Sequence, residues 1–135
     1  DGPPPNFAAA DVSFISLKRI LPPLKALLPA GSNIVALIKP QFEAGKSLVG
    51  KSGVVRERSV HVDVLLSVTE FAASIGFALR GLTFSPITGG DGNIEFLALW
   101  SVETEEESEN LTDPAERKSR IRSVVDEAHR VLNPM

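Results

Sequence analysis

The sequence of 135 residues contains no cysteine, no tyrosine, one tryptophan and two histidines. Without cysteine the chain forms no disulfide and offers no thiolate ligand or cysteine nucleophile. The histidines, His61 and His129, lack the close helical spacing of a metal-binding pair, so the sequence predicts no metal site. No apolar run approaches about 18 residues, and the opening segment does not resemble a signal peptide, so we expect a cytoplasmic protein without a membrane partner.

The composition is that of one soluble globular domain, with 43% hydrophobic and 23% charged residues. The net charge of −3 is unevenly spread, because residues 1–100 carry +1 and residues 101–135 carry −4. Lysine and arginine give residues 39–58 a local charge of +3. Such a basic segment is compatible with phosphate contacts and equally with a solvated loop.

Apolar periodicity predicts alternating strands and helices, which is an α/β pattern with mostly parallel strands and a final antiparallel hairpin. Pro22 and Pro23 interrupt the first helical pattern, so we expect that helix to start near Pro22 after a tight turn. A long loop is predicted from Pro40 to about Arg58. The remaining elements are predicted as strands at 8–15, 34–38, 77–84 and 94–100 and a helix at 59–75.

Beyond the predicted domain at residues 1–100, the composition changes. Residues 101–113 form an acidic run, which predicts a solvated linker. Asp113 and Pro114 have the signature of a helix start, and apolar residues recur at helical spacing through residues 114–133. This added C-terminal helix needs an apolar surface, either its own sheet or a second subunit.

Three charged residues adjoin otherwise apolar strands: Asp11, Lys39 and Glu95. In an open α/β sheet, ligands bind beyond the carboxyl ends of the parallel strands, where Asp11 and Lys39 are expected. If the last strand is antiparallel, its beginning lies at the same edge and brings Glu95 there. The cluster is then either an ion pair that sets strand register or an active site in which lysine orients or deprotonates a hydroxyl.

Four sequence blocks resemble one known family. They are DVSFISL (11–17), ALIKPQFEAG (36–45), VGK (49–51) with GVVR (53–56), and SPITGGDGNIEF (85–96). The chain is similar over roughly residues 8–100 to the TlyA-type, or hemolysin A, proteins. These are methyltransferases of the ribose 2′-hydroxyl in ribosomal RNA, and they have an FtsJ-like Rossmann fold.

The resemblance implies a Lys-Asp-Lys-Glu catalytic tetrad, of which Asp11, Lys39 and Glu95 match three members. It implies S-adenosylmethionine as cofactor and ribosomal RNA or ribosomal subunits as partner. It also makes the basic loop a substrate-side loop, in which Lys46, Lys51 and Arg56 contact RNA phosphates.

Parts of the family pattern are missing from the sequence: the first tetrad lysine, the glycine-rich cofactor loop and the N-terminal RNA-binding domain. We therefore expect the C-terminal half of a Rossmann-like methyltransferase sheet, which binds S-adenosylmethionine weakly and is inactive as an isolated chain. Half a sheet leaves an exposed edge strand, so dimerisation through that edge or through the C-terminal helix is a further hypothesis. The alternative function is a non-catalytic Rossmann-like interaction module.

Residues 45–52, GKSLVGKS, match the nucleotide-binding pattern G-x-x-x-x-G-K-[ST]. That motif requires a helix to begin at its Gly-Lys-Ser, so that amide groups face phosphate. Gly53-Val54-Val55 follows here and favours no helix, which makes a P-loop nucleotide-binding protein the less favoured prediction.

Overall fold

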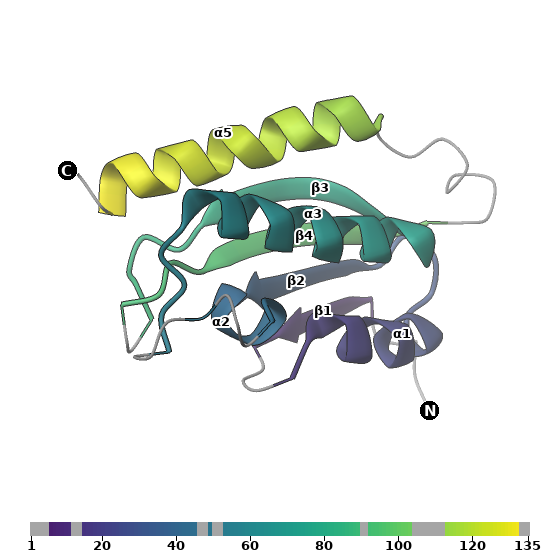
Figure 1. Ribbon diagram of the computed structural model, residues 1–135. Coiled ribbons are helices and arrows are strands. Elements are labelled where there is room, and N and C mark those ends of the chain that lie inside the picture. The colour runs from purple at the N-terminus through teal and green to yellow at the C-terminus, as the bar shows by residue number, and fades with distance from the viewer. Residues whose placement is uncertain are drawn as a thin grey trace.

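Four strands form one sheet in the order β1-β2-β4-β3 (Figure 1). A computed structural model describes residues 6–11, 15–45, 49, 53–89, 92–103 and 113–132. The strands are β1 (Phe7–Ala10), β2 (Asn33–Ile38), β3 (Phe77–Phe84) and β4 (Phe96–Val102). The helices are α1 (Leu17–Leu27), α2 (Pro40–Glu43), α3 (Arg58–Ser74) and α5 (Pro114–Leu132).

The sheet is mixed, because β1 and β2 are parallel while β4 runs antiparallel to both of its neighbours, β2 and β3. The chain passes from β3 directly into β4, which inserts between β2 and β3. The predicted α/β fold and its terminal antiparallel pair are therefore confirmed. A register shift between Leu79 and Gly81 interrupts the β3–β4 ladder, as a β-bulge does.

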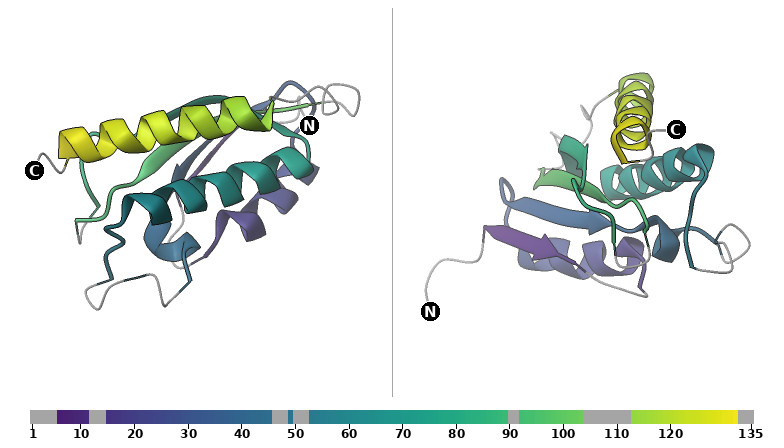
Figure 2. Two further views of the ribbon diagram at one scale, coloured as in Figure 1. Left: turned by 45° about the horizontal axis from the view of Figure 1, so that its top comes forward. Right: turned by 90° about the vertical axis from the view of Figure 1, so that its left-hand side faces the viewer.

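The described helices lie on one side of the sheet (Figure 2). Because the helices cover one face, the burial of side chains alternates along β2 and along most of β4. In β2, Ile34, Ala36 and Ile38 are buried, while Val35 and Leu37 are only half-buried. The buried face carries the largest fully buried side chains of the core, among them Trp100, Phe77, Phe96, Leu17, Leu21, Ile34, Ile38, Leu65 and Ile121. The uninterrupted apolar run at residues 34–38 is typical of a strand buried on both faces, but one face of β2 is only half-buried in the structure.

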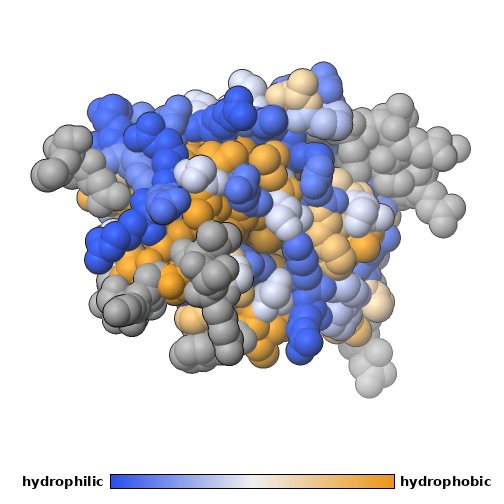
Figure 3. All heavy atoms as spheres, viewed as in Figure 1, coloured by the Kyte–Doolittle hydropathy of each residue, from blue (hydrophilic) through white to orange (hydrophobic). Residues whose placement is uncertain are grey.

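Helix α5 packs on this domain, against α3 and β3. Ile121, Val125 and Ala128 form its fully buried stripe, which confirms docking on the chain's own sheet rather than a free apolar face. In the view of Figure 3, polar side chains cover α5 along the top, and apolar surface is visible below it. The ion pairs Arg58–Asp126 (3.5 Å) and Arg117–Glu70 (3.8 Å) also join α5 to α3.

Helix α1 corrects the prediction that it starts near Pro22. It begins at Leu17, with Ser16 as N-cap accepting from the Lys18 amide, and runs unbroken through Pro22 and Pro23. Both prolines are exposed, and so are Lys18 and Arg19, the residues four positions earlier whose carbonyls lose an amide partner. Burial of Leu17 and Leu21 against the sheet outweighs the local preference of proline to break the helix.

Three other boundaries differ from the prediction. The first strand ends at Ala10 rather than at residue 15. The predicted loop after β2 opens with the short helix α2, which has Pro40 at its first position. Strand β4 spans Phe96–Val102 rather than 94–100. Residues 101 and 102, which were predicted to belong to the acidic linker, are therefore part of the strand. Glu103 is buried there and pairs with Arg80 at 2.5 Å, which keeps the chain on the sheet for longer. Residues 104–112 lie outside the described residues.

Candidate active site at the sheet edge

The three charged residues singled out from the sequence lie at one edge of the sheet. Strand β1 pairs with β2 up to Ala10↔Ala36, and β2 pairs with β4 up to Ile38↔Phe96. Asp11 and Lys39 directly follow their strands, and Glu95 directly precedes β4. The parallel and antiparallel directions therefore bring two strand ends and one strand beginning to the same edge (Figure 1).

Asp11 and Lys39 are in direct contact, with 2.5 Å between the Asp11 Oδ1 and Lys39 Nζ atoms. The lysine side chain is 14% exposed, whereas the aspartate side chain is 63% exposed. A pair with one solvated partner avoids most of the desolvation penalty of a fully buried pair. The amine is thus held at the surface of the sheet edge, where a substrate can approach it from the side of Asp11.

Glu95 is half-buried and is held by the helix that Lys39 begins. Gln41 on α2 donates its side-chain amide to Glu95 Oε2 at 3.3 Å. A β-carbon at Gly89 would come within 2.7 Å of the same oxygen, so the absence of a side chain there leaves room for the carboxylate. The backbone carbonyl of Glu95 also accepts a hydrogen bond from the Ser85 amide at 2.8 Å, which fixes the backbone of Glu95. Sequence reasoning missed both Gln41 and Gly89, because their roles depend on contacts across the fold.

Glu43 joins the two segments that carry Asp11 and Lys39. Its Oε1 accepts from the Ser16 hydroxyl at 2.6 Å, and its Oε2 accepts from the Leu17 amide at 2.7 Å. The carboxylate therefore satisfies a free amide at the N-terminus of α1, where negative charge is favourable. Helix α2 is in this way tied to the start of α1, which stabilises the Asp11–Lys39 edge.

The basic residues predicted to meet RNA are only partly described. Lys46 and Lys51 lie outside the described residues. Arg56 is described and is exposed, directly before the N-cap of α3. The C-terminal part of the loop, residues 53–57, is irregular, and the next described helix begins at Arg58. Residues 46–48 and 50–52 of the GKSLVGKS segment are outside the described part, and the described residues after it form no phosphate-facing helix.

Two histidines that are far apart in the sequence form a buried pair beside this loop. His61 Nδ1 lies 2.7 Å from His129 Nε2, and His61 Nε2 lies 3.1 Å from the Val55 carbonyl oxygen. Because the carbonyl can only accept, His61 carries its proton on Nε2 and accepts from His129 through Nδ1. His61 is fully buried and also packs against the Phe96 ring.

The environment of this pair favours the neutral form. Burial, followed by the charge of His129, lowers the pKa of His61 to about 4. Burial and nearby Arg58 also lower the pKa of His129, although Asp126 opposes the shift. Within the described residues, no group of three or more histidines and carboxylates could hold a metal ion. The pair is therefore a structural hydrogen bond between α3 and α5 near neutral pH.

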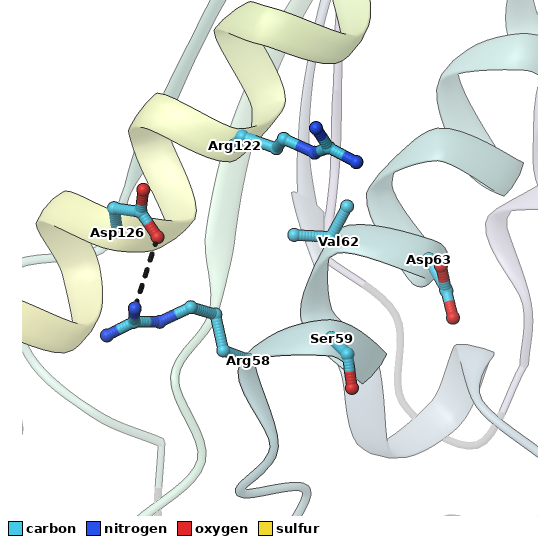
Figure 4. Close-up of a pocket in the computed structure, with 6 residues that line it drawn as sticks. All are labelled: Arg58, Ser59, Val62, Asp63, Arg122 and Asp126. Atoms are coloured by element: carbon cyan, nitrogen blue, oxygen red, sulfur yellow. Dashed lines mark ion pairs between the residues drawn. The ribbon is translucent and has the colours of Figure 1, made fainter.

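A groove of about 460 Å³ opens between the first turns of α3 and the middle of α5. Figure 4 shows its lining, in which Arg58 reaches toward Asp126 across the gap and Arg122 also projects into it. Asp63 lines the same groove, so the positive and negative side chains balance. Asp11, Lys39 and Glu95 do not line this groove, so it is separate from the charged edge of the sheet.

Among the helices that the structure describes, none is long and apolar enough to cross a membrane.

Comparison with known proteins identifies relatives along nearly the whole chain. The family model for FtsJ-like methyltransferases matches residues 2–101. YqxC of Bacillus subtilis is 54% identical over 130 residues, which is 95% of this chain and 44% of the relative. The 16S/23S rRNA (cytidine-2′-O)-methyltransferase TlyA of Mycobacterium tuberculosis is 34% identical over 128 residues, with the same two coverages.

The solved structures agree with the sequence comparison. A hemolysin-like protein of Streptococcus thermophilus superposes with a TM-score of 0.86 at 46% identity, covering 97% of this chain and 45% of that one. The chain thus spans less than half the length of the curated relatives given above, at 44% of each.

Proposed function

Because the chain belongs to the FtsJ-like methyltransferase family, we propose that it is the catalytic half of an enzyme that methylates ribose 2′-hydroxyls of ribosomal RNA. The observation that carries the proposal is the Lys39 amine, paired with Asp11 at the edge of the sheet where Glu95 also lies. The Mycobacterium tuberculosis relative is a 16S/23S rRNA (cytidine-2′-O)-methyltransferase, which gives that substrate class and that position on the ribose. Such a substrate implies work in the cytoplasm, on ribosomal RNA or ribosomal subunits.

In this proposal Lys39 lies beside the ribose 2′-hydroxyl and orients it or accepts its proton. Asp11 holds the Lys39 amine through the ion pair. Glu95, directly before β4, adds a second carboxylate at the same edge of the sheet. The ribose oxygen loses its proton and gains a methyl group, so the role of these residues is positioning and proton transfer. Positioning of this kind depends on rigid supports, which Gln41 and Glu43 provide through the bonds described above.

S-adenosylmethionine, the cofactor proposed for the complete protein, supplies the methyl group when bound. The residues at this edge fit the hydroxyl side of the reaction, since they offer a lysine and two carboxylates. They do not include the glycine-rich loop that follows the first strand of a Rossmann sheet and leads into a helix, which is the feature expected to bind the cofactor. We therefore propose that this chain alone binds S-adenosylmethionine weakly and transfers no methyl group.

Arg56, Lys46 and Lys51 are the proposed contacts to RNA phosphates. The support is the exposure of Arg56 at the end of the loop and the local positive charge of residues 39–58. Phosphate contacts contribute affinity without selecting sequence, so these residues do not identify the target nucleotide.

The decisive experiment measures methyl transfer from labelled S-adenosylmethionine to ribosomal RNA by a protein that contains this chain together with the remaining length of the relatives. We expect Lys39→Ala to lower kcat by at least about a hundredfold. Lys118→Ala removes an exposed lysine on α5 and serves as the matched control. A Lys39→Ala enzyme within threefold of wild type would refute the proposed role of Lys39.

An interaction module is the second candidate, favoured by one observation. Strand β1 is an edge strand among the described residues, and its first residue, Phe7, is 56% exposed. An edge strand that carries an exposed apolar side chain favours pairing with another strand, so we propose that the isolated chain dimerises through β1. Dimerisation through α5 is less favoured, because its apolar stripe is already buried. Light scattering at high concentration decides the matter, and a monomer mass would contradict the proposal.

A further inference from the structure

The residue two positions before Glu95, Asn93, is buried although it belongs to a glycine-rich turn. It is 2% exposed and follows Gly92, whose φ of +90° is in the left-handed region that favours glycine. Its backbone carbonyl accepts from the Gly89 amide at 2.8 Å, which closes the turn. Its composition by itself is typical of a flexible connection between two strands; residues 90 and 91 lie outside the described residues.

The side chain of Asn93 binds the backbone of the substrate-side loop at two points. Its Oδ1 accepts from the Val55 amide at 2.9 Å, and its Nδ2 donates to the Gly53 carbonyl at 2.9 Å. These are the two bonds that a neighbouring strand residue would make. A single side chain therefore holds residues 53–55 beside the entrance to β4, across about 40 residues of sequence.

The held segment is fixed from its other side as well. Val54 and Val55 are 5% and 2% exposed, and the Val55 carbonyl bonds to His61 of α3. Gly53, at φ +78°, allows the turn that precedes this segment. The chain then emerges at once into solvent with Arg56. Val55, the residue directly before Arg56, is thus held through its amide by Asn93 and through its carbonyl by His61.

We propose that Asn93 is a positioning residue for the RNA substrate, which sets Arg56 in place relative to Glu95. The inference rests on the proposed function, because it assigns Arg56 a phosphate of the RNA whose ribose reaches the Lys39 edge. Asn93 touches neither reacting atom. It acts through the backbone of Gly53 and Val55, so its loss moves a binding contact and leaves the Asp11–Lys39 pair in place.

A double-mutant cycle between Asn93 and Arg56 tests this in the same methyl-transfer assay, with RNA affinity measured by filter binding over a range of salt. We expect Arg56→Ala to raise the KM for RNA about fivefold and to reduce the salt dependence of binding by roughly one phosphate contact. Asn93→Ala should do the same, with kcat within about twofold of wild type. In the Arg56→Ala background, Asn93→Ala should change KM by less than about twofold, because the two residues act as one unit.

Additive effects of the two substitutions on KM, or an unchanged salt dependence in Asn93→Ala, would overturn the positioning role. Thr69→Val removes another buried side-chain hydrogen bond, to Leu65 O on α3, and should leave KM unchanged. If Asn93→Ala fails to fold by circular dichroism, Asn93→Asp replaces it, since that side chain keeps the acceptor for Val55 and loses the donor to Gly53.

Failure of the proposed function has a different signature. In that case the wild-type enzyme transfers no methyl group to ribosomal RNA. The filter-binding cycle then still judges Asn93 through RNA affinity, and equal affinities of wild type and Asn93→Ala would refute its role.

Discussion

Acidification from pH 7 to pH 5 should destabilise the chain through the buried histidine pair. His61 is neutral in the folded state, with its pKa lowered to about 4, whereas an unfolded histidine has a pKa of about 6.5. Because the unfolded state binds the proton more tightly, stability is fully present above pH 6.5 and is lost as the pH falls toward 4. His129, whose pKa is also lowered, contributes with the same sign.

The magnitude follows from the two pKa values of His61. The free energy of unfolding should fall by about 2 kcal/mol between pH 7 and pH 5, and by about 3 kcal/mol by pH 4. Structurally, a proton added to His61 Nδ1 faces the donor Nε2–H of His129, with Arg58 nearby and Asp126 as the opposing charge. The window from pH 7 to 5 is chosen because most carboxylates titrate below it.

Urea unfolding at several pH values measures this effect, followed by fluorescence of the single, fully buried Trp100. The control is His61→Gln, in which position 61 does not titrate. Its stability at pH 7 will be lower, but its loss between pH 7 and pH 5 should be smaller than that of wild type by about 2 kcal/mol. Equal losses in the two proteins would show that His61 is not the group responsible.

Two further predictions concern the supports of the site and the fold. Glu43→Ala should lower the free energy of unfolding by about 1–2 kcal/mol, since the Ser16 hydroxyl and the Leu17 amide both lose their acceptor. Urea denaturation measures this loss, and Glu127→Ala, which removes an exposed carboxylate, is the control. If Glu43→Ala and wild type were equally stable, the bonds from Glu43 to Ser16 and Leu17 would not stabilise the fold. Ile121→Ala should cost about 3 kcal/mol by opening a cavity under α5, and a change below about 0.5 kcal/mol would mean that α5 is not anchored there.

Much of the site could be predicted because it depends on strand direction. Apolar runs that end in Asp11 and Lys39, and a final strand preceded by Glu95, place three charges at one edge once the sheet is parallel and its last strand is reversed. The Asp11–Lys39 contact at 2.5 Å agrees with that expectation. The catalytic roles of the three residues stay a prediction.

The supports of the site could not be predicted in the same way. Gln41, Glu43 and Asn93 act through partners 26 to 54 residues away in the sequence, and no local pattern announces such a bond. The His61–His129 pair was equally hidden, because its spacing of 68 residues matches no helical motif. The histidine contact exists only after α3 and α5 have packed together, and the other three exist only after distant segments have assembled around the sheet.

The amino-acid sequence by itself determined which segments become strands and helices and on which strand ends the charges lie, because those properties follow from the period of apolar residues and from turn chemistry. Only the tertiary structure decided that α1 continues through Pro22 and Pro23, that β4 extends to Val102, and that Asn93 holds the loop before Arg56. The physical reason is common to all three. Each depends on burial or on a hydrogen bond between distant segments, which outweighs the local preference of the chain.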